Sequence, residues 1–325
     1  MNTLDLLQKL EAYDITNCLV HHQGELIYRY EQFDGASTLL MPINSCTKSV
    51  LSALICIALD KRLLPSPDAL VCDFFPMLRD DADERKQNMT LRHLLTMTAG
   101  FQWNEFGGSN SFPKMTRSPN WIQFVLEQPM SHDPGTKMVY NSGVSQLLAA
   151  ILVRSAGTKV SQFAEEMLFA PLSIEQYEWK TDPQGVHTGG YGLQLSANDL
   201  LKFGLVYLHR GMWNGQEVLP SDLVRQSVQP AIAASPPERG FYGWHWWADS
   251  VQAPRESTHA HAYRLNYYYA RGYGGQFIFV VPACESVVVF TRKRYKKDLS
   301  PHDIFREQLA PLLAAPHRMH AVFCS

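Results

Sequence analysis

Short segments near both ends of the chain have the hydrophobic pattern of β-strands. Residues 18–22 and 25–30 lie on either side of Gln23-Gly24, which predicts a β-hairpin closed by a glycine turn. Residues 282–285 contain Pro282 and fit a second turn, between two β-branched, apolar runs. Three strands are predicted toward the C-terminal end, at residues 241–248, 276–281 and 286–291.

The middle of the chain has helical patterns instead. Residues 50–59 are apolar nearly all round, which predicts a buried helix. Further helices are predicted at residues 91–95, 121–127, 144–156, 160–169, 198–208 and 301–313. Strands at both ends with helices between them predict an α+β fold, in which one sheet is built from distant segments. We expect a single domain over residues 1–325, with a sheet-containing part at 1–55 and 236–325 and a mostly helical insertion at 56–235.

Composition narrows the classes of partner. The 325 residues are 46% hydrophobic, which is enough for a large core. A formal net charge of −2 gives no basic field for nucleic acid and no polybasic patch for membrane insertion. The run Arg292-Lys293-Arg294, continued by Lys296-Lys297, is interpreted as a solvated strand end. A small-molecule substrate is therefore the expected partner, and the oligomeric state stays open.

Cysteine, histidine and N-terminal patterns predict neither a metal site nor export. The six cysteines lack metal-site spacing, and the twelve histidines, with His259 and His261 among them, form no cluster with a third ligand. We expect no metal and no cofactor. Charged residues interrupt the N-terminus before an apolar core forms, and residues 50–59 are too short to span a bilayer. The sequence thus predicts a cytoplasmic protein without disulfides.

Two S-x-x-K matches occur in the chain, at Ser45-Lys48 and at Ser111-Lys114. About one such match is expected by chance in a sequence of this length, so spacing alone has little value. Pro113 lies inside the second match and opposes a helix there, so its serine and lysine are not expected on one face.

The first match leads directly into the apolar helix of residues 50–59, with Asn44 or Ser45 available as N-cap. Positions three apart share a helix face, which places the Lys48 amine beside the Ser45 hydroxyl. Cys46 points about 100° away from Ser45 on a helix and is interpreted as a packing residue. This pair suits an activated serine nucleophile.

Acyl transfer also needs a proton shuttle and donors for the oxyanion, and two later segments offer them. Tyr140-Asn141-Ser142-Gly143 precedes an apolar helix, so Tyr140 projects from a loop-to-helix junction. Arg271-Gly272-Tyr273-Gly274-Gly275-Gln276 opens a strand, and its glycines let the backbone approach a ligand closely.

With these segments, the chain resembles the serine β-lactamase-like superfamily, which includes class C β-lactamases, DD-peptidases (penicillin-binding proteins), and related esterases and amide hydrolases such as nylon-oligomer hydrolases. The family's three motifs correspond here to Ser45-x-x-Lys48, Tyr140-x-Ser142 and Tyr273-Gly274-Gly275. The likeness also includes residues 93–100, 190–215 and 242–244, and it extends over most of residues 20–310. The resemblance implies an antiparallel sheet flanked by helices and a catalytic domain.

The resemblance also implies residue roles. Ser45 would be the acylated nucleophile, and Lys48 would lower the cost of deprotonating it. Tyr140 would act as general base and then as general acid. The backbone amides of Ser45 and Gln276 would form the oxyanion hole. The substrate pocket would include Ser142, Tyr273, Gly274, Gly275, Arg271 and Trp244, although Trp244 is also a candidate core residue.

Two residues depart from the family's usual motifs. Ser142 replaces the asparagine of the second motif, and Tyr273 replaces the lysine or histidine of the third. A cation at that third-motif position normally helps to hold a substrate carboxylate. Its replacement argues against β-lactams and peptide termini as the main substrates, although Arg271 could reach the same region.

Three hypotheses remain at this point. The first is a serine hydrolase of the carboxylesterase or amidase type, which acts on small esters or amides through an acyl-enzyme. The second is a DD-peptidase or weak β-lactamase. The third is a catalytically silent binding or regulatory protein that keeps the fold.

Overall fold

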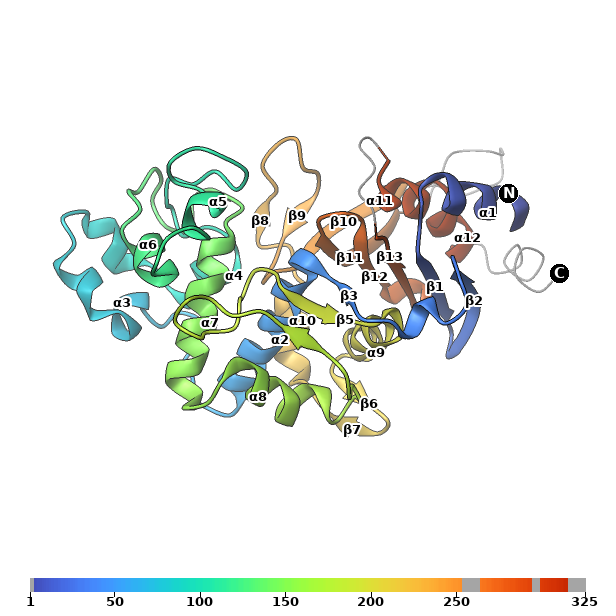
Figure 1. Cartoon of the computed structure of the whole chain (residues 1–325), viewed down its shortest axis with the longest axis horizontal. Helices are drawn as coiled ribbons and strands as arrows, with labels where there is room; N and C mark the ends of the chain where they lie inside the picture. The colour runs from blue at the N-terminus through green and yellow to red at the C-terminus, as the bar shows by residue number, and fades with distance from the viewer. Residues whose placement is uncertain (1–2, 253–263, 294–298, 315–325) are drawn as a thin grey trace.

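A computed structural model describes residues 3–252, 264–293 and 299–314. Its centre is an eight-stranded antiparallel sheet with the strand order β2-β1-β13-β12-β11-β10-β9-β8 (Figure 1). Its strands are β1 (Asn17–His22), β2 (Glu25–Glu31), β8 (Ile232–Ala233), β9 (Phe241–Tyr242), β10 (Trp247–Gln252), β11 (Arg264–Gly272), β12 (Gln276–Val281) and β13 (Ser286–Thr291). Strands from both ends of the chain lie side by side, which confirms the predicted α+β fold.

The first strand pairs with the last one, across almost the whole sequence. Asn17 lies opposite Thr291, and His22 lies opposite Ser286. Strands β12 and β13 are buried along their whole length, as their continuous apolar runs require when both faces of a sheet are covered. The predicted hairpins at both ends of the chain are confirmed.

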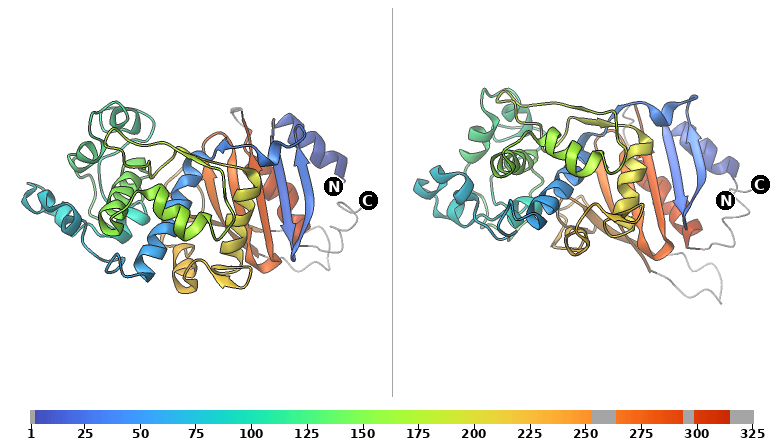
Figure 2. Two further views of the ribbon diagram at one scale, coloured as in Figure 1. Left: turned by 60° about the horizontal axis from the view of Figure 1, so that its bottom comes forward. Right: turned by 90° about the horizontal axis from the view of Figure 1, so that it is seen from below.

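Helices cover both faces of the sheet (Figure 2). Helix α9 (Ala197–Leu208) packs on one face, where Gly204 allows close approach because a Cβ atom there would lie 2.8 Å from Ile278 Cγ2. Phe279 points to the opposite face and stacks on Phe305 of the C-terminal helical segment, with ring centroids 4.0 Å apart. That segment consists of α11 (Pro301–Ile304), a π turn and α12 (Ala310–Leu313), and α1 (Thr3–Ala12) lies beside it.

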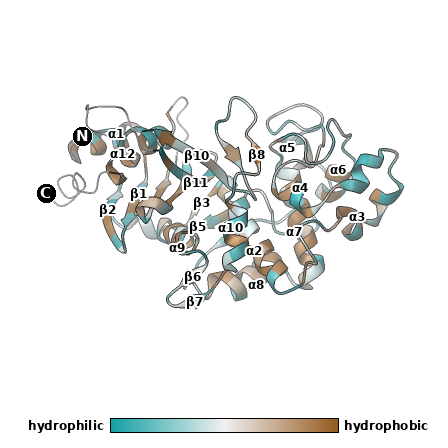
Figure 3. Ribbon diagram, turned by 180° about the vertical axis from the view of Figure 1, so that it is seen from behind, coloured by the Kyte–Doolittle hydropathy of each residue, from teal (hydrophilic) through white to brown (hydrophobic). Residues whose placement is uncertain are grey.

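The helical part of the molecule is built around two long apolar helices, α2 (Thr47–Asp60) and α7 (Ser142–Ala156), which contact each other. Nearly every residue of α2 is buried, and Figure 3 shows its mostly hydrophobic sequence. The remaining helices are α3 (Val71–Phe74), α4 (Leu91–Leu95), α5 (Phe112–Met115), α6 (Trp121–Leu126), α8 (Val160–Ala164) and α10 (Ser221–Ser227). The helices expected from periodicity are thus confirmed, with ends shifted by a few residues.

A second, three-stranded sheet has the order β3-β5-β4, with β3 (Met41–Pro42), β5 (Leu193–Leu195) and β4 (Glu178–Trp179). Met41 pairs with Leu195 and Pro42 with Gln194. This pairing places the segment just before Ser45 beside the segment that follows Gly190. Two further short strands, β6 (Met212–Trp213) and β7 (Gln216–Glu217), form a separate hairpin.

Three local expectations were wrong. Residues 241–248 form two strands instead of one, because the chain turns between β9 and β10 and His245 adopts a positive φ of 58°. Pro113 does not prevent a helix, since it lies in the first turn of α5, where proline is tolerated. Arg292 is only 3% exposed and donates to backbone carbonyls, so it is not solvated.

Some expectations fall outside the described residues, namely those on His259, His261, Arg294, Lys296, Lys297 and Cys324. Among the helices that the structure describes, none has the length and apolar character needed to cross a bilayer.

Candidate active site

Ser45 lies in a single 3₁₀ turn, Asn44–Cys46, that leads into α2. The expected N-cap by Asn44 or Ser45 is wrong, because Cys46 is the N-cap and no side chain caps the helix. The side chain of Asn44 instead donates to the carbonyl of Tyr273 at 2.6 Å. This bond joins the turn that carries the serine to the β11–β12 hairpin.

Lys48 lies in the first turn of α2 and is buried among polar groups. Its ammonium donates to Ser45 Oγ at 3.3 Å, to Ser142 Oγ at 2.9 Å and to the Gly190 carbonyl at 2.8 Å. The residue is only 1% exposed. Because an ammonium has three donors, these contacts satisfy it completely.

Gly190 was not expected in the site, although the sequence contained it in the family-like stretch. A Cβ atom at this position would lie 3.0 Å from Ser142 Cβ and 3.2 Å from Lys48 Nζ. A side chain there would be tighter than ordinary packing allows, so the glycine permits the close approach of the Gly190 carbonyl to the lysine.

Tyr140 precedes α7 and lies against the same lysine. Lys48 Nζ is 4.8 Å from the centre of the Tyr140 ring. The ring stacks on Trp247 at 5.9 Å and meets Tyr242 edge-on at 6.3 Å. Asn141, the middle residue of the motif, is the N-cap of α7 and accepts from the amides of Gly143 and Val144. Its capping role leaves Ser142 to face the lysine.

A carboxylate that sequence reasoning missed lies behind Ser142. Glu105 accepts from the Ser142 amide at 2.9 Å, from the Ser142 hydroxyl, and from Trp103 Nε1 at 2.8 Å. Lys48, Ser142 and Glu105 therefore form one chain of hydrogen bonds, with a single hydroxyl between ammonium and carboxylate. The negative charge of Glu105 balances the buried positive charge of Lys48.

The third motif lies in the turn between β11 and β12, and the segment 271–276 opens a strand as expected, because β12 begins at Gln276. Tyr273, Gly274 and Gly275 connect β11 to β12, with φ of 89° at Gly274 and 103° at Gly275. Tyr273 is 62% exposed. Gln276 begins β12, is 2% exposed, and bonds through its side chain to the backbone of Arg292.

Arg271 lies beside Trp247, a ring that contacts Tyr140, whereas Trp244 lies in the core. The guanidinium of Arg271 lies over Trp247, 4.9 Å from the ring centre, and forms an ion pair with Glu238. Trp244 is 2% exposed and packs against Arg92, with 5.6 Å between the guanidinium and the ring centre. The aromatic residues that contact Tyr140 are thus Tyr242 and Trp247, whereas Trp244 is a core residue.

Two titratable groups beside the site are held neutral. Burial raises the pKa of the Cys46 thiol, which donates to the Gln276 carbonyl at 3.6 Å. Burial, and secondarily the charge of Lys48, lowers the pKa of His245 to about 3. The His245 ring bonds to the Leu95 carbonyl and to the Ser145 hydroxyl. The buried Cys46 thiol is therefore neither ionised nor accessible enough to act as a nucleophile. The buried His245 ring is uncharged and supplies no cation to the site.

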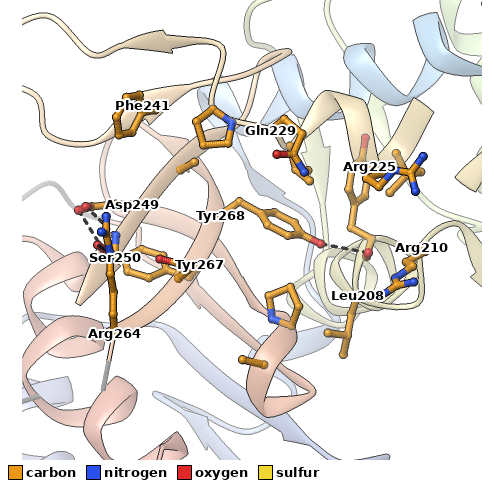
Figure 4. Close-up of a pocket in the computed structure, with 18 residues that line it drawn as sticks. Leu208, Arg210, Arg225, Gln229, Phe241, Asp249, Ser250, Arg264, Tyr267 and Tyr268 are labelled. Atoms are coloured by element: carbon orange, nitrogen blue, oxygen red, sulfur yellow. Dashed lines mark hydrogen bonds between the residues drawn. The ribbon is translucent and has the colours of Figure 1, made fainter. Parts of the chain in front are cut away.

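A large cavity lies away from these residues, between the end of α9, α10 and one face of β10 and β11 (Figure 4). It measures about 850 Å³, and Tyr268 projects across it to bond with the Tyr207 carbonyl. Its rim includes Arg210, Arg225 and Arg264. None of the residues expected in the active site lines this cavity.

The β-lactamase family model matches residues 20–310, which include every residue described around Ser45. The chain belongs to the β-lactamase family. Among curated proteins, the chain is similar to monacolin J acid methylbutanoyltransferase from Aspergillus terreus, with 29% identity over 133 residues. A similar match is the acyltransferase mokF from Monascus pilosus, with 30% identity over 132 residues. Each match covers 37% of this chain and 30% of the relative's length.

Solved structures show the same β-lactamase-like fold at lower identity. The octameric penicillin-binding protein homologue from Pyrococcus abyssi has a TM-score of 0.74 and 18% identity, over 97% of this chain and 78% of that one. EstCE1, described as a hydrolase with promiscuous acyltransferase activity, has a TM-score of 0.71 and 16% identity, over 99% and 97%. At this level of identity, these structures show that the chain shares their fold.

Proposed function

We propose that this β-lactamase-family chain is a serine hydrolase of the esterase or amidase type, which acts on small substrates through an acyl-enzyme at Ser45. The observation that carries the proposal is the 3.3 Å contact between the Lys48 ammonium and the half-buried Ser45 hydroxyl. The lysine is withdrawn from solvent and bonded on all sides, so it presents a fixed charge to the serine. The family and its acyltransferase relatives support the same chemistry.

In the acylation step, Ser45 Oγ attacks the carbonyl carbon of the substrate and gives its proton to the Tyr140 oxygen, which acts as a phenolate base. The phenol that results then protonates the leaving alcohol or amine, so that the bond to Ser45 forms as the C–O or C–N bond of the substrate breaks. The ammonium of Lys48 stabilises the negative charge that develops on these oxygens. The backbone amides of Ser45 and Gln276 are our candidates for the oxyanion hole.

In the deacylation step, water attacks the acyl carbon, its proton passes to Tyr140, and Ser45 recovers a proton as the acid leaves. An alcohol can replace water in the same step, which would give a new ester. The acyltransferase names of the curated relatives are the reason to measure this second outcome beside hydrolysis. Product analysis in the presence of a primary alcohol would measure the ratio of ester to free acid.

The DD-peptidase or β-lactamase alternative is less well supported. Tyr273 occupies the position where a cation would hold the substrate carboxylate, and the nearby Arg271 is already paired with Glu238. We expect little or no hydrolysis of nitrocefin and no stable adduct with labelled penicillin.

The direct test is intact-mass analysis after exposure to a fluorophosphonate, combined with hydrolysis of p-nitrophenyl esters. We expect one adduct on the wild-type chain, none on Ser45→Ala, and an unchanged adduct on the matched control Ser111→Ala. An adduct that persists in Ser45→Ala would remove Ser45 as the nucleophile. Ester hydrolysis that is unchanged in Ser45→Ala would favour the silent binding protein.

A further inference from the structure

Arg271 places a positive charge at the wall of the proposed active site. It is the second-last residue of β11, and its guanidinium covers the Trp247 ring. The Trp247 ring also stacks on Tyr140, the proposed proton shuttle, and on Tyr269. Arg271 and Tyr140 therefore share Trp247 as a neighbour, and the turn that follows Arg271 is bonded to Asn44, next to Ser45. A carboxylate on a substrate bound there would be attracted to this guanidinium.

The charge of Arg271 is already paired within the chain. Glu238, in the loop between β8 and β9, accepts from both terminal nitrogens of the guanidinium, one of them at 2.5 Å. Two parallel bonds are the geometry in which arginine binds a carboxylate most strongly. Burial opposes the charge of Arg271, yet the hydrogen bonds and charge of Glu238 outweigh it and keep the pKa of Arg271 above its ordinary value. Glu238 thus fills the carboxylate-binding side of the guanidinium.

Two other cations in the described part of the chain, Lys48 and Arg292, are committed to internal partners. Lys48 uses its three donors on Ser45, Ser142 and Gly190. Arg292, beneath the β11–β12 turn, is 3% exposed and donates to the carbonyls of Gly274, Tyr13 and Leu299. By contrast, the side chains of Arg271 and Glu238 are each about one-third exposed, at 35% and 33%, so a substrate can reach the pair.

We propose that Glu238 determines the acyl specificity of the site, because it occupies Arg271 and thereby excludes substrates whose acyl group carries a carboxylate. This inference rests on the serine hydrolase function proposed above. An anionic acyl group would have to displace Glu238 or lie beside it with uncompensated repulsion. An uncharged acyl group of the same length meets an ion pair with no net charge. The substrate class is therefore uncharged esters or amides.

The test compares two esters of equal chain length, p-nitrophenyl butyrate and the mono-p-nitrophenyl ester of succinic acid. We expect the wild-type kcat/KM to favour butyrate by about a hundredfold. The Glu238→Gln variant keeps the shape of the side chain but frees the charge of Arg271, and should shift the ratio toward succinate by about tenfold or more. Adding Arg271→Gln to that variant should cancel the shift.

A remote ion pair supplies the matched control. Lys9 and Glu307 form an exposed pair at 3.2 Å on the helical layer behind the sheet, so Glu307→Gln makes the same change in net charge far from the site. It should leave the ratio of the two esters unchanged. Thermal unfolding of each variant, followed by circular dichroism, verifies that it is folded.

The outcomes separate the two proposals. Butyrate hydrolysis with an equal rate for the succinate ester, or a Glu238→Gln ratio equal to the wild-type ratio, would overturn the specificity inference and leave the hydrolase intact. If Glu238→Gln does not fold, Arg271→Gln alone gives the second test, and it should lower succinate turnover further because Glu238 then has no partner. If neither ester is hydrolysed and Ser45 takes no fluorophosphonate, the proposed function fails and the inference fails with it.

Discussion

The two S-x-x-K sequences have the same spacing but form very different structures. Ser45 precedes a fourteen-residue buried helix, and Lys48 is enclosed with three partners. Ser111 precedes a four-residue helix, and its buried hydroxyl donates to the Gly108 carbonyl at 2.8 Å, while Lys114 is exposed. The difference shows that spacing only makes a contact possible. Burial, and the partners supplied by α7 and by Gly190, turn it into a candidate catalytic pair.

The strongest test of this comparison replaces each lysine. Lys48→Ala removes the charge beside Ser45 and should lower kcat for ester hydrolysis by about a thousandfold or more. Lys114→Ala should leave kcat unchanged, because this lysine is exposed and Ser111 bonds elsewhere. Steady-state kinetics on p-nitrophenyl butyrate would measure both, and equal losses would show that the enclosed pair has no special role.

A smaller effect is expected from Glu105, the third member of the Lys48–Ser142 chain. Glu105→Gln keeps the shape but removes the negative charge, and should lower kcat by about ten- to a hundredfold. Loss of an anion favours the deprotonated form of nearby ionising groups, so the pH–rate profile should also move to lower pH. A purely structural role would reduce the rate without moving the profile, which makes the profile the decisive measurement.

A variant at Gly190 tests whether activity requires the close contact between the Gly190 backbone and Lys48. Gly190→Ala should lower kcat by about tenfold, because its Cβ would crowd Lys48 Nζ and Ser142 Cβ. The control is Gly107→Ala in the loop before Ser111, where a Cβ would have no neighbour within 4 Å. A fall in activity of similar size in both variants would contradict the steric argument.

The last expected effect concerns stability in acid. Burial lowers the pKa of His245 to about 3, whereas the unfolded chain titrates near 6.5. Between these values only the unfolded state binds the proton, so stability is complete above about pH 6.5 and falls as the pH drops. At pH 5 this one group should cost about 2 kcal/mol.

Urea unfolding at pH 7 and pH 5 would measure this loss, and His245→Gln should make the pH dependence shallower. His302, whose pKa burial also lowers to about 3, supplies a second contribution that the variant should retain. An identical pH dependence in wild type and variant would exclude His245 as a source.

Much of the fold could be predicted because local patterns carry it. The β-branched, apolar runs at residues 276–281 and 286–291 predict buried strands, and the structure has strands there. The apolar run after Ser45 predicts a buried helix, and it forms α2. The split of residues 241–248 escaped prediction because it depends on a positive φ at His245, and that residue is bonded to Leu95 and Ser145 far away in sequence.

The contacts of the site could be predicted only where both interacting residues belong to the same short motif. Ser45 and Lys48 are one turn apart, whereas Glu105 lies 37 residues before Ser142 in an irregular loop, with no periodic signal. Arg292 was misjudged for a similar reason. A run of basic residues usually indicates a solvated surface, and the carbonyls that bind Arg292 come from Tyr13, Gly274 and Leu299.

The pairing of β1 with β13 has a consequence for synthesis of the chain. Asn17 and Thr291, joined in the sheet, are 274 residues apart. At ribosomal speeds of roughly 5–20 residues per second, β1 emerges roughly 15–55 s before its partner strand. During that interval one edge of the first hairpin has no strand to bind, and an unpaired edge readily recruits other chains. The nascent protein is therefore expected to need a chaperone most before residue 291 leaves the ribosome.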